Sequence, residues 1–123
     1  MASAAAFMPG PLHTVYYASK AYVLSFSEAL QLELAGSGVT VTALCPGPVK
    51  SKFLSSAGGP KNNVFPALES RDVADEGYRA MMNGMRVVVP GHALRFMLAI
   101  LPRLMLAFIT LKRNKTILKA ESP

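Results

Sequence analysis

Tyr16-Tyr17-Ala18-Ser19-Lys20 opens the clearest helical pattern in this 123-residue chain. Beyond this segment, apolar residues recur at the spacing of one helix face, at Val23, Phe26, Leu30 and Leu34. Gly36 then supplies a C-terminal stop. The pattern predicts a helix over residues 13–35 that packs through its apolar side and presents Tyr16 and Lys20 on its other face.

Tyr16 and Lys20 are four residues apart, which places side chains on one helix face about 5–6 Å apart at Cβ. A free tyrosine is a poor base near neutrality, and an adjacent ammonium group favours its phenolate form. Such a phenol can exchange protons during catalysis. A tyrosine and a lysine at this spacing also occur by chance on solvated helix faces, so the pair needs supporting context.

Supporting context lies on both sides of the helix. Ser3 stands thirteen residues before Tyr16 and begins a run of small residues, Ser3-Ala4-Ala5-Ala6. After the helix, an apolar strand is predicted over residues 39–45, and Pro46 ends it because proline cannot continue a central strand. The segment that follows is Pro46-Gly47-Pro48-Val49-Lys50-Ser51.

With Ser3, the Tyr16-x-x-x-Lys20 pair and the Pro46-Gly47 segment in this order and spacing, the chain resembles the short-chain dehydrogenase/reductase family. The resemblance covers nearly the whole chain, including Asp72-Val73-Ala74 and Arg86 to Gly91, which are similar to the family's penultimate helix and last strand. It implies hydride transfer between NAD or NADP and a small-molecule carbonyl or secondary alcohol.

The family's site residues carry over position by position. The resemblance implies that Tyr16 exchanges the hydroxyl proton, that Lys20 supports the phenolate and binds the nicotinamide ribose, and that Ser3 hydrogen-bonds the substrate oxygen. It also implies that the nicotinamide carboxamide is held by Pro46, Gly47, Val49 and Ser51. Tyr17 is a rival for the proton role, but only Tyr16 has both family spacings.

The family's glycine-rich dinucleotide turn, Gly-x-x-x-Gly-x-Gly between a strand and a helix, is not found among the nine glycines. We therefore expect an α/β fold that is the C-terminal portion of a Rossmann-like, doubly wound parallel sheet, with the N-terminal nucleotide-binding half missing. On this interpretation the chain is the C-terminal half of a family member. Catalysis by the isolated chain is then not expected.

Two strands are predicted, over residues 39–45 and 86–90, with helices near 13–35, 71–84 and 93–112. Residues 52–70 hold glycine, proline and asparagine turns and are predicted to be a loop. That loop either covers the substrate, as the resemblance implies, or is a plain surface connection. Residues 1–92 are assigned to the family domain and residues 93–123 to a C-terminal extension.

The extension is apolar and basic. An apolar stripe runs through Leu94, Met97, Leu98, Leu101, Met105, Phe108 and Ile109, with a kink expected at Pro102. Six basic residues and one acidic residue fall within residues 94–123, which contribute +5 to the net charge of +6. Docking onto the protein's own core or a subunit partner is the favoured interpretation, and peripheral membrane contact through residues 94–119 is the alternative.

Other compositional signals are mostly negative. Cys45 is the single cysteine, which fits a reducing, cytoplasmic location, and the two histidines with one cysteine give no metal-ligand spacing. No signal peptide is indicated. The aromatic residues do not interleave with the basic run as a nucleic-acid stacking surface requires, so no nucleic-acid partner is expected.

Three functions remain open on the sequence. The chain is part of an NAD(P)-dependent oxidoreductase, a catalytically inactive interaction protein, or a membrane-surface module. In the family the helix that carries Tyr-x-x-x-Lys often packs against a partner's copy, so the resemblance implies a homo-oligomer of the full-length protein. Substrate identity and the choice between NAD and NADP are not encoded in any residue assigned above.

Overall fold

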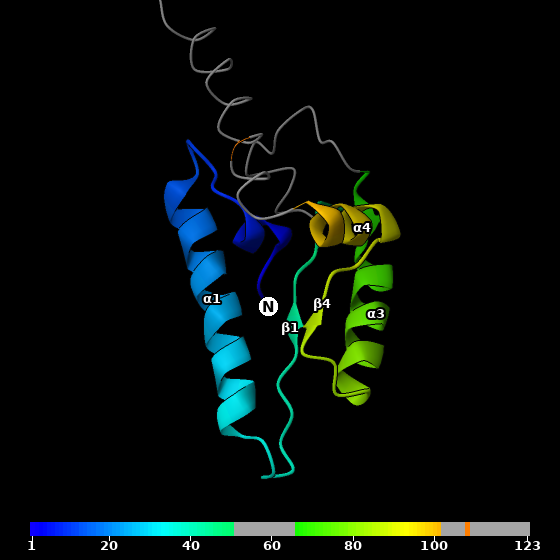
Figure 1. Ribbon diagram of the computed structural model, residues 1–123. Coiled ribbons are helices and arrows are strands. Elements are labelled where there is room, and N and C mark those ends of the chain that lie inside the picture. Colours follow the sequence, from blue (N-terminus) through cyan, green and yellow to red (C-terminus); the bar gives the residue numbers. More distant parts are fainter. Residues whose placement is uncertain (51–65, 102–107, 109–123) are drawn as a thin grey trace, which may run out of the picture.

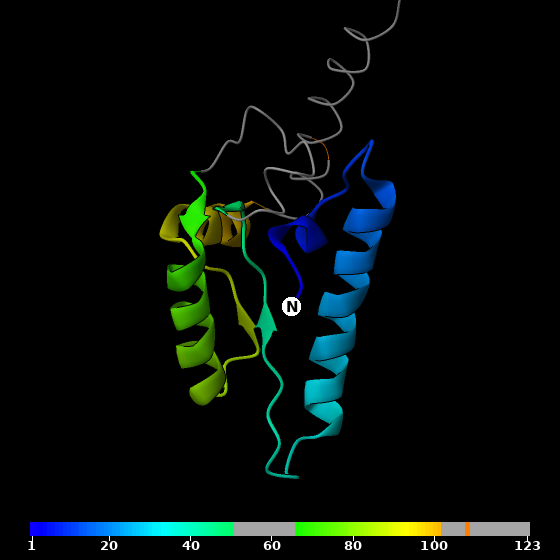
Figure 2. The ribbon, with the colours of Figure 1, turned by 180° about the vertical axis from the view of Figure 1, so that it is seen from behind.

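The computed structural model describes residues 1–50, 66–101 and 108. Parallel strands and flanking helices make an α/β fold, as the sequence predicts. The elements in chain order are η1 (Ala4–Phe7), α1 (Thr14–Glu33), β1 (Ala43–Leu44), β2 (Val49–Lys50), β3 (Leu68–Glu69), α3 (Ser70–Met82), β4 (Val87–Val88) and α4 (His92–Ile100). In Figures 1 and 2, α1 lies on one side of the strand layer, α3 lies on the other, and α4 crosses one end.

The centre of the fold is the parallel pair β1–β4, with Ala43 opposite Val87. The N-terminal segment runs along the other edge of β1, because the Ala2 and Ala4 amides donate to the Leu44 and Pro46 carbonyls at 2.8 and 2.9 Å. Three extended segments therefore lie side by side. The hydrogen bonds that join these segments follow the pattern of a parallel sheet.

The two predicted strands are much longer than the observed ones. β1 and β4 each span two residues, since the ladder between them consists of the Ala43 amide to the Arg86 carbonyl and the Cys45 amide to the Val88 carbonyl, both 2.8 Å. Val39, at the start of the predicted strand, is 56% exposed. Alternation of β-branched residues predicted a strand from residue 39, but residues 39–42 are not in a strand, because a strand needs a neighbouring backbone to pair with.

A second parallel pair, β2–β3, was not predicted. It aligns Val49 with Leu68, and it places Lys50 beside Glu69. Leu68 and Glu69 fall inside the predicted 52–70 loop, whose residues 52–65 lie outside the described part of the chain. The polar and charged residues around these strands hid the pair from a search for apolar runs.

Helix α1 agrees closely with the predicted 13–35 helix and ends where expected. The Leu34 amide caps it on the Leu30 carbonyl at 3.0 Å, and Gly36 follows with a φ of +86°, a conformation that favours glycine. The predicted apolar face is partly wrong. Leu24 is the buried residue of α1, whereas Phe26 is 54% exposed and stacks on Tyr22.

Helix α4 ends at Ile100, which is earlier than the predicted 93–112. Leu101 is extended, with φ −84° and ψ 117°, as expected for a residue that precedes proline. Helix α4 therefore ends before the proline, and the kink predicted at Pro102 lies outside the described residues. Met105 and Ile109 of the predicted stripe lie outside the described residues.

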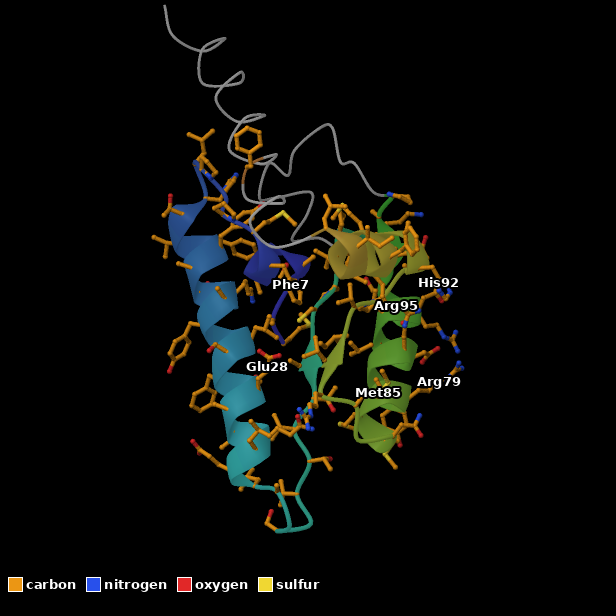
Figure 3. The ribbon with its side chains drawn as sticks, in the orientation of Figure 1. Phe7, Glu28, Arg79, Met85, His92 and Arg95 are labelled. Atoms are coloured by element: carbon orange, nitrogen blue, oxygen red, sulfur yellow. The ribbon has the colours of Figure 1, made fainter. Side chains whose placement is uncertain are left out.

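The core lies between the strand layer and its helices. Its buried members are Ala2, Ala4, Ala6, Leu24, Ala43, Cys45, Val89 and Leu94, and Phe7 of η1, labelled in Figure 3, packs against them. Small residues dominate because the N-terminal segment and η1 pass close to α1. On the other side of the layer, Gly77 of α3 lies against Leu44: a Cβ at Gly77 would be 2.9 Å from the Leu44 Cδ2.

Candidate active site

The carboxyl ends of the N-terminal segment and of β1 meet at one edge of the layer, where open α/β sheets bind their ligands. Ser3 ends the first segment and caps η1 by accepting the Ala5 amide at 3.2 Å. Its hydroxyl also donates to the Pro46 carbonyl at 3.4 Å. The structure thus brings two predicted site residues, Ser3 and Pro46, into direct contact across the layer.

Tyr16 and Lys20 lie together in the first half of α1. The Lys20 Nζ is 5.6 Å from the centroid of the Tyr16 ring, within cation–π range. Tyr16 is 40% exposed, so its phenol is open to a ligand. Among the described residues Lys20 forms no ion pair. The predicted pairing of an accessible phenol with a nearby cation is therefore present.

Tyr17, the rival phenol, is held by packing that the sequence analysis missed. Its ring covers Gly10 so closely that a Cβ there would be 2.2 Å from the Tyr17 Cδ2 and Cε2. The same ring meets Tyr16 edge-on, with centroids 5.9 Å apart and planes at 78°. Gly10, within Pro9-Gly10-Pro11, is thus needed for close packing, and Tyr17 buttresses Tyr16. The glycine between two prolines was the feature of the sequence that could have indicated this packing.

The Pro46–Val49 loop joins β1 to β2. Pro46 is buried, and its carbonyl accepts from both the Ala4 amide and the Ser3 hydroxyl. At Gly47 a Cβ would be 2.8 Å from the Leu94 Cδ2, so α4 packs directly on this loop. Val49 is half-buried in β2. Ser51, the fourth residue predicted to hold the nicotinamide, lies outside the described residues.

These residues fit the nicotinamide end of NAD or NADP in their donor chemistry. The Lys20 ammonium is not ion-paired within the described chain, and the neighbouring Tyr16 phenol is exposed, so both can reach a ribose hydroxyl. Gly47 is covered on one side by Leu94, and Val49 lies in β2, paired with Leu68. No other feature of the described residues points to the rest of the dinucleotide.

Cys45 lies under this site and is fully buried. Burial raises the pKa of its thiol from 9.0 to about 11, and the backbone of Ser3 partly opposes that increase. The thiol donates weakly to the Ala43 carbonyl at 3.8 Å. A thiol that stays protonated is a poor nucleophile, so Cys45 is a packing residue here.

Several features stand apart from this edge. No group of three or more metal-ligating side chains occurs within residues 1–50, 66–101 and 108. A shallow depression of about 560 Å³ lies on α4 and is lined by His92, Ala93, Arg95, Phe96 and Ala99. It is built from α4 alone and includes none of the predicted site residues. We place the candidate site at the edge of the layer that carries Tyr16, because the side chains that could exchange a proton with a ligand lie there.

The predicted site is thus assembled as two contacts, Ser3 with Pro46 and Tyr16 with Lys20. Packing of η1 against α1 brings the two neighbourhoods together. In the described part of the chain, no hydrogen bond joins the Ser3 hydroxyl to the Tyr16 phenol. The arrangement can exchange a proton at Tyr16 and can offer a hydroxyl at Ser3 to a ligand between them.

Comparison with known proteins identifies the family. The model for short chain dehydrogenase matches residues 1–62 of the 123, a span that holds Ser3, Tyr16, Lys20 and the Pro46–Ser51 segment. The chain therefore belongs to the short-chain dehydrogenase family. Membership makes the chain homologous to oxidoreductases, and a nicotinamide dinucleotide is the cofactor of that family.

Curated relatives agree with this assignment. An uncharacterized oxidoreductase of Myxococcus xanthus is 40% identical over 75 residues, which are 58% of this chain and 27% of the relative. Sulfoacetaldehyde reductase of Chromohalobacter salexigens is 45% identical over 55% of this chain and 30% of its own length. Very-long-chain 3-oxoacyl-CoA reductase of Anas platyrhynchos is 30% identical over 95% of this chain and 37% of its own length. The chain thus spans roughly a third of these relatives.

The family match contradicts two predictions from the sequence. The chain was expected to be the C-terminal half of a family member, with the nucleotide-binding half of a Rossmann-like sheet missing. The family model instead matches residues 1–62, the N-terminal portion of this chain, so the family assignment rests there and those predictions do not stand. The physical reason is that the absence of one glycine-rich turn is not the absence of a half domain.

No solved structure matches this chain. Within the described residues, no helix is both long enough and apolar enough to span a bilayer.

Proposed function

We propose that this chain carries the proton-transfer site of an NAD(P)-dependent oxidoreductase that interconverts a carbonyl and a secondary alcohol. The observation that supports this most directly is the Lys20 Nζ at 5.6 Å from the ring of an exposed Tyr16. An ammonium next to a phenol favours the phenolate, and an accessible phenol can act on a bound substrate. Family membership supplies the reaction class.

In the reducing direction the Tyr16 hydroxyl donates its proton to the carbonyl oxygen, and in the oxidising direction the Tyr16 phenolate takes the proton from the alcohol. Lys20 stabilises the phenolate that remains after donation. Tyr17 keeps the Tyr16 ring in place from the side, since it is itself fixed against Gly10. A bound nicotinamide dinucleotide would supply or accept the hydride, with Lys20 and the Val49 backbone holding its nicotinamide end.

Ser3 would orient the substrate oxygen. Its hydroxyl has one proton, which now goes to the Pro46 carbonyl at 3.4 Å, a long distance for an O–H···O bond. That carbonyl already accepts the Ala4 amide at 2.9 Å, so it stays satisfied when the hydroxyl turns to a substrate. The Ala5 amide keeps the Ser3 oxygen in position throughout. Ser3 therefore has a weak bond that a substrate can replace.

The substrate class is taken from the relatives. Their names point to an aldehyde, a 3-oxoacyl thioester and a steroid ketone, the last from the 17-beta-hydroxysteroid dehydrogenase type 3 of Mus musculus. One carbonyl of each class makes a suitable panel. Oxidation of NADH or NADPH at 340 nm in the presence of each compound measures turnover, and calorimetric titration with each nucleotide measures binding separately.

The decisive comparison is between the two neighbouring phenols. Tyr16→Phe keeps the ring but removes the proton, so we expect kcat/KM to fall by about 10²–10⁴-fold with nucleotide binding unchanged. Tyr17→Phe also keeps its ring and its packing on Gly10, and we expect it to stay within about threefold of the parent protein. Equal losses in both variants would contradict the assignment of Tyr16.

Lys20→Met tests the cation. Methionine has a similar length without charge, so we expect kcat/KM to fall, because the Tyr16 phenolate left after proton donation loses its neighbouring cation. A chain that is folded by circular dichroism but binds neither nucleotide would contradict the proposed function. Such a result would favour the inactive interaction protein.

A further inference from the structure

Gly10 lies in the turn that leads into α1, and its backbone is tightly restrained. A proline stands on each side of it, and the ring of a proline holds φ at about −65°. The Gly10 carbonyl accepts the His13 amide at 3.1 Å, which closes the turn. Leu12, inside the turn, is 63% exposed and has a φ of +70°, a conformation that leucine rarely adopts. The turn is thus kept closed although it strains Leu12.

Space, and not backbone conformation, requires a glycine at position 10. The φ of Gly10 is not positive, so its backbone does not lie in the left-handed region that favours glycine. Gly10 is buried, however, and a Cβ there would be 2.2 Å from the Cδ2 and Cε2 of Tyr17. The Tyr17 ring occupies the place that a side chain at position 10 would take. Gly10 therefore determines where that ring can lie.

The turn holds Tyr17 at two points. The Tyr17 amide donates to the His13 carbonyl at 3.1 Å, and the Tyr17 ring lies on Gly10. The same ring meets Tyr16 edge-on, with centroids 5.9 Å apart. Neighbouring positions on a helix project about 100° apart and do not face each other, so helical geometry alone does not make this contact. The contact between the two rings therefore depends on the turn.

We propose that Gly10 is a positioning residue for Tyr16 and acts through the ring of Tyr17. This inference rests on the proposed role of Tyr16 in proton transfer. A phenol exchanges its proton only within hydrogen-bond distance of the substrate oxygen, so a displacement of about 1 Å can cost about 10²-fold in rate. A methyl group at position 10 displaces the Tyr17 ring and removes the edge-on support of Tyr16.

NMR of the full chain with isotope-labelled tyrosine rings tests this contact without any need for turnover. The parent protein should show nuclear Overhauser effects between the rings of Tyr16 and Tyr17, and Gly10→Ala should lose them. Gly77→Ala is the matched control, because it also adds a methyl group against a packed side chain, 2.9 Å from the Leu44 Cδ2. Gly77 is on α3, across the strand layer from α1 (Figures 1 and 2), so this variant should keep the signals. Unchanged signals in a folded Gly10→Ala protein would overturn the proposal.

Turnover of the carbonyl panel gives the second readout. Gly10→Ala should lower kcat by about 10–100-fold, while the KM and the calorimetric affinity for the nucleotide stay within about twofold. Gly77→Ala should keep its kcat within about threefold of the parent protein. Equal losses of kcat in the two glycine variants would contradict a specific effect on Tyr16. If the parent protein turns over none of the carbonyls, the proposed function fails, whereas the NMR comparison still decides whether Gly10 positions Tyr16.

A double-mutant cycle tests Tyr17 as the link and decides the question even if Gly10→Ala alone does not fold. Tyr17→Ala removes the ring, so it should lower kcat by about 10–100-fold, as Gly10→Ala does. In that background the added Cβ meets no ring, so Gly10→Ala should cause no further loss of kcat or of melting temperature. Tyr17→Phe keeps the ring and should stay close to the parent protein. Additive losses across the cycle, or a Tyr17→Ala protein as active as Tyr17→Phe, would overturn the proposal.

Discussion

The strand pairs β1–β4 and β2–β3 have the same backbone pairing, but the first pair is buried and the second lies at the surface. Both are parallel and two residues long. The first lies between α1 and α3, with Ala43 and Val88 only 2% and 3% exposed, and none of the described charged side chains is buried there. The second is at the surface, where Lys50 and Glu69 form an ion pair at 2.5 Å between side chains about 60% exposed.

This difference shows where the stability of the protein resides. Ladder hydrogen bonds contribute little net free energy by themselves, because water competes for the same groups in the unfolded chain. Packing around β1–β4 adds the apolar burial that the outer pair lacks. The outer pair mainly holds β3, and with it the start of α3, beside Pro48. There the Leu68 amide donates to the Pro48 carbonyl at 2.9 Å.

The largest expected effect is a pH dependence that belongs to the inner pair. Burial of Cys45 raises its thiol pKa from 9.0 to about 11, so the folded state favours the protonated thiol. The resulting stability is complete below about pH 9 and is lost as the pH rises through 11. The loss approaches about 3 kcal/mol, since one pKa unit corresponds to about 1.36 kcal/mol.

Urea unfolding of the parent protein and of Cys45→Ala, followed from pH 8 to 11.5, measures this loss. The two proteins share every other ionisable group, so the difference between the two curves isolates the thiol. The parent protein should lose more of its free energy of unfolding than the variant does. Parallel curves would show that the thiol is not held in its neutral form.

Overpacking the inner pair comes next in size. In Gly77→Val, the new Cβ meets the Leu44 Cδ2 at 2.9 Å and the added methyl groups extend the conflict, so we expect the free energy of unfolding to fall by about 2 kcal/mol. Ala74→Val on the exposed side of α3 places the same β-branched side chain without a neighbour. A loss in Gly77→Val no larger than in that control would contradict the tight α3–β1 contact.

A smaller effect is expected at Gly47, which lies between the two pairs. Gly47→Ala brings a Cβ to 2.8 Å from the Leu94 Cδ2, the flexible end of a side chain, and should cost about 1 kcal/mol. The cost should disappear in the Leu94→Ala background, because the conflicting atoms are then gone. A double-mutant cycle measured by thermal unfolding gives the coupling. Additive losses would show that α4 does not press on the loop.

The smallest effect belongs to the outer pair. The hydrogen bond and charge of Glu69 raise the pKa of Lys50, but both side chains are largely exposed and screened by solvent. Lys50→Ala and Glu69→Ala, alone or together, should therefore leave the urea midpoint unchanged within error, in low and in high salt. A clear, salt-dependent fall of the urea midpoint in either variant would contradict the conclusion that the outer pair contributes little stability.

Sequence periodicity predicted the bounds of α1 well because a stop follows its apolar pattern, whereas α4 ends at Ile100, before its predicted end at residue 112. Gly36 ends α1 by its left-handed backbone, and α4 ends where Leu101, the residue before a proline, is extended. The strands were predicted less well, because Val39 and its neighbours prefer extension but have no partner backbone. The β2–β3 pair could not be found at all, since Lys50 and Glu69 meet only when the chain folds back.

The candidate site shows the same division. Tyr16 and Lys20 are four residues apart on one helix, so their proximity follows from helical geometry alone. Ser3 and Pro46 are 43 residues apart, and only the alignment of the N-terminal segment with β1 brings them together. The support of Tyr16 by Tyr17 depends on the close approach of Gly10, which no spacing rule predicts.

The sequence by itself determined the helices, the local Tyr16–Lys20 pair and the order of segments that identifies the family, because these depend on residues near one another in the chain. Only the tertiary structure decided which apolar faces are buried. It covered Leu24 and Leu94 and left Phe26 and Phe96 in solvent, although only Phe26 and Leu94 belong to the apolar patterns found in the sequence. Burial depends on which surfaces meet across the strand layer, and that information is non-local.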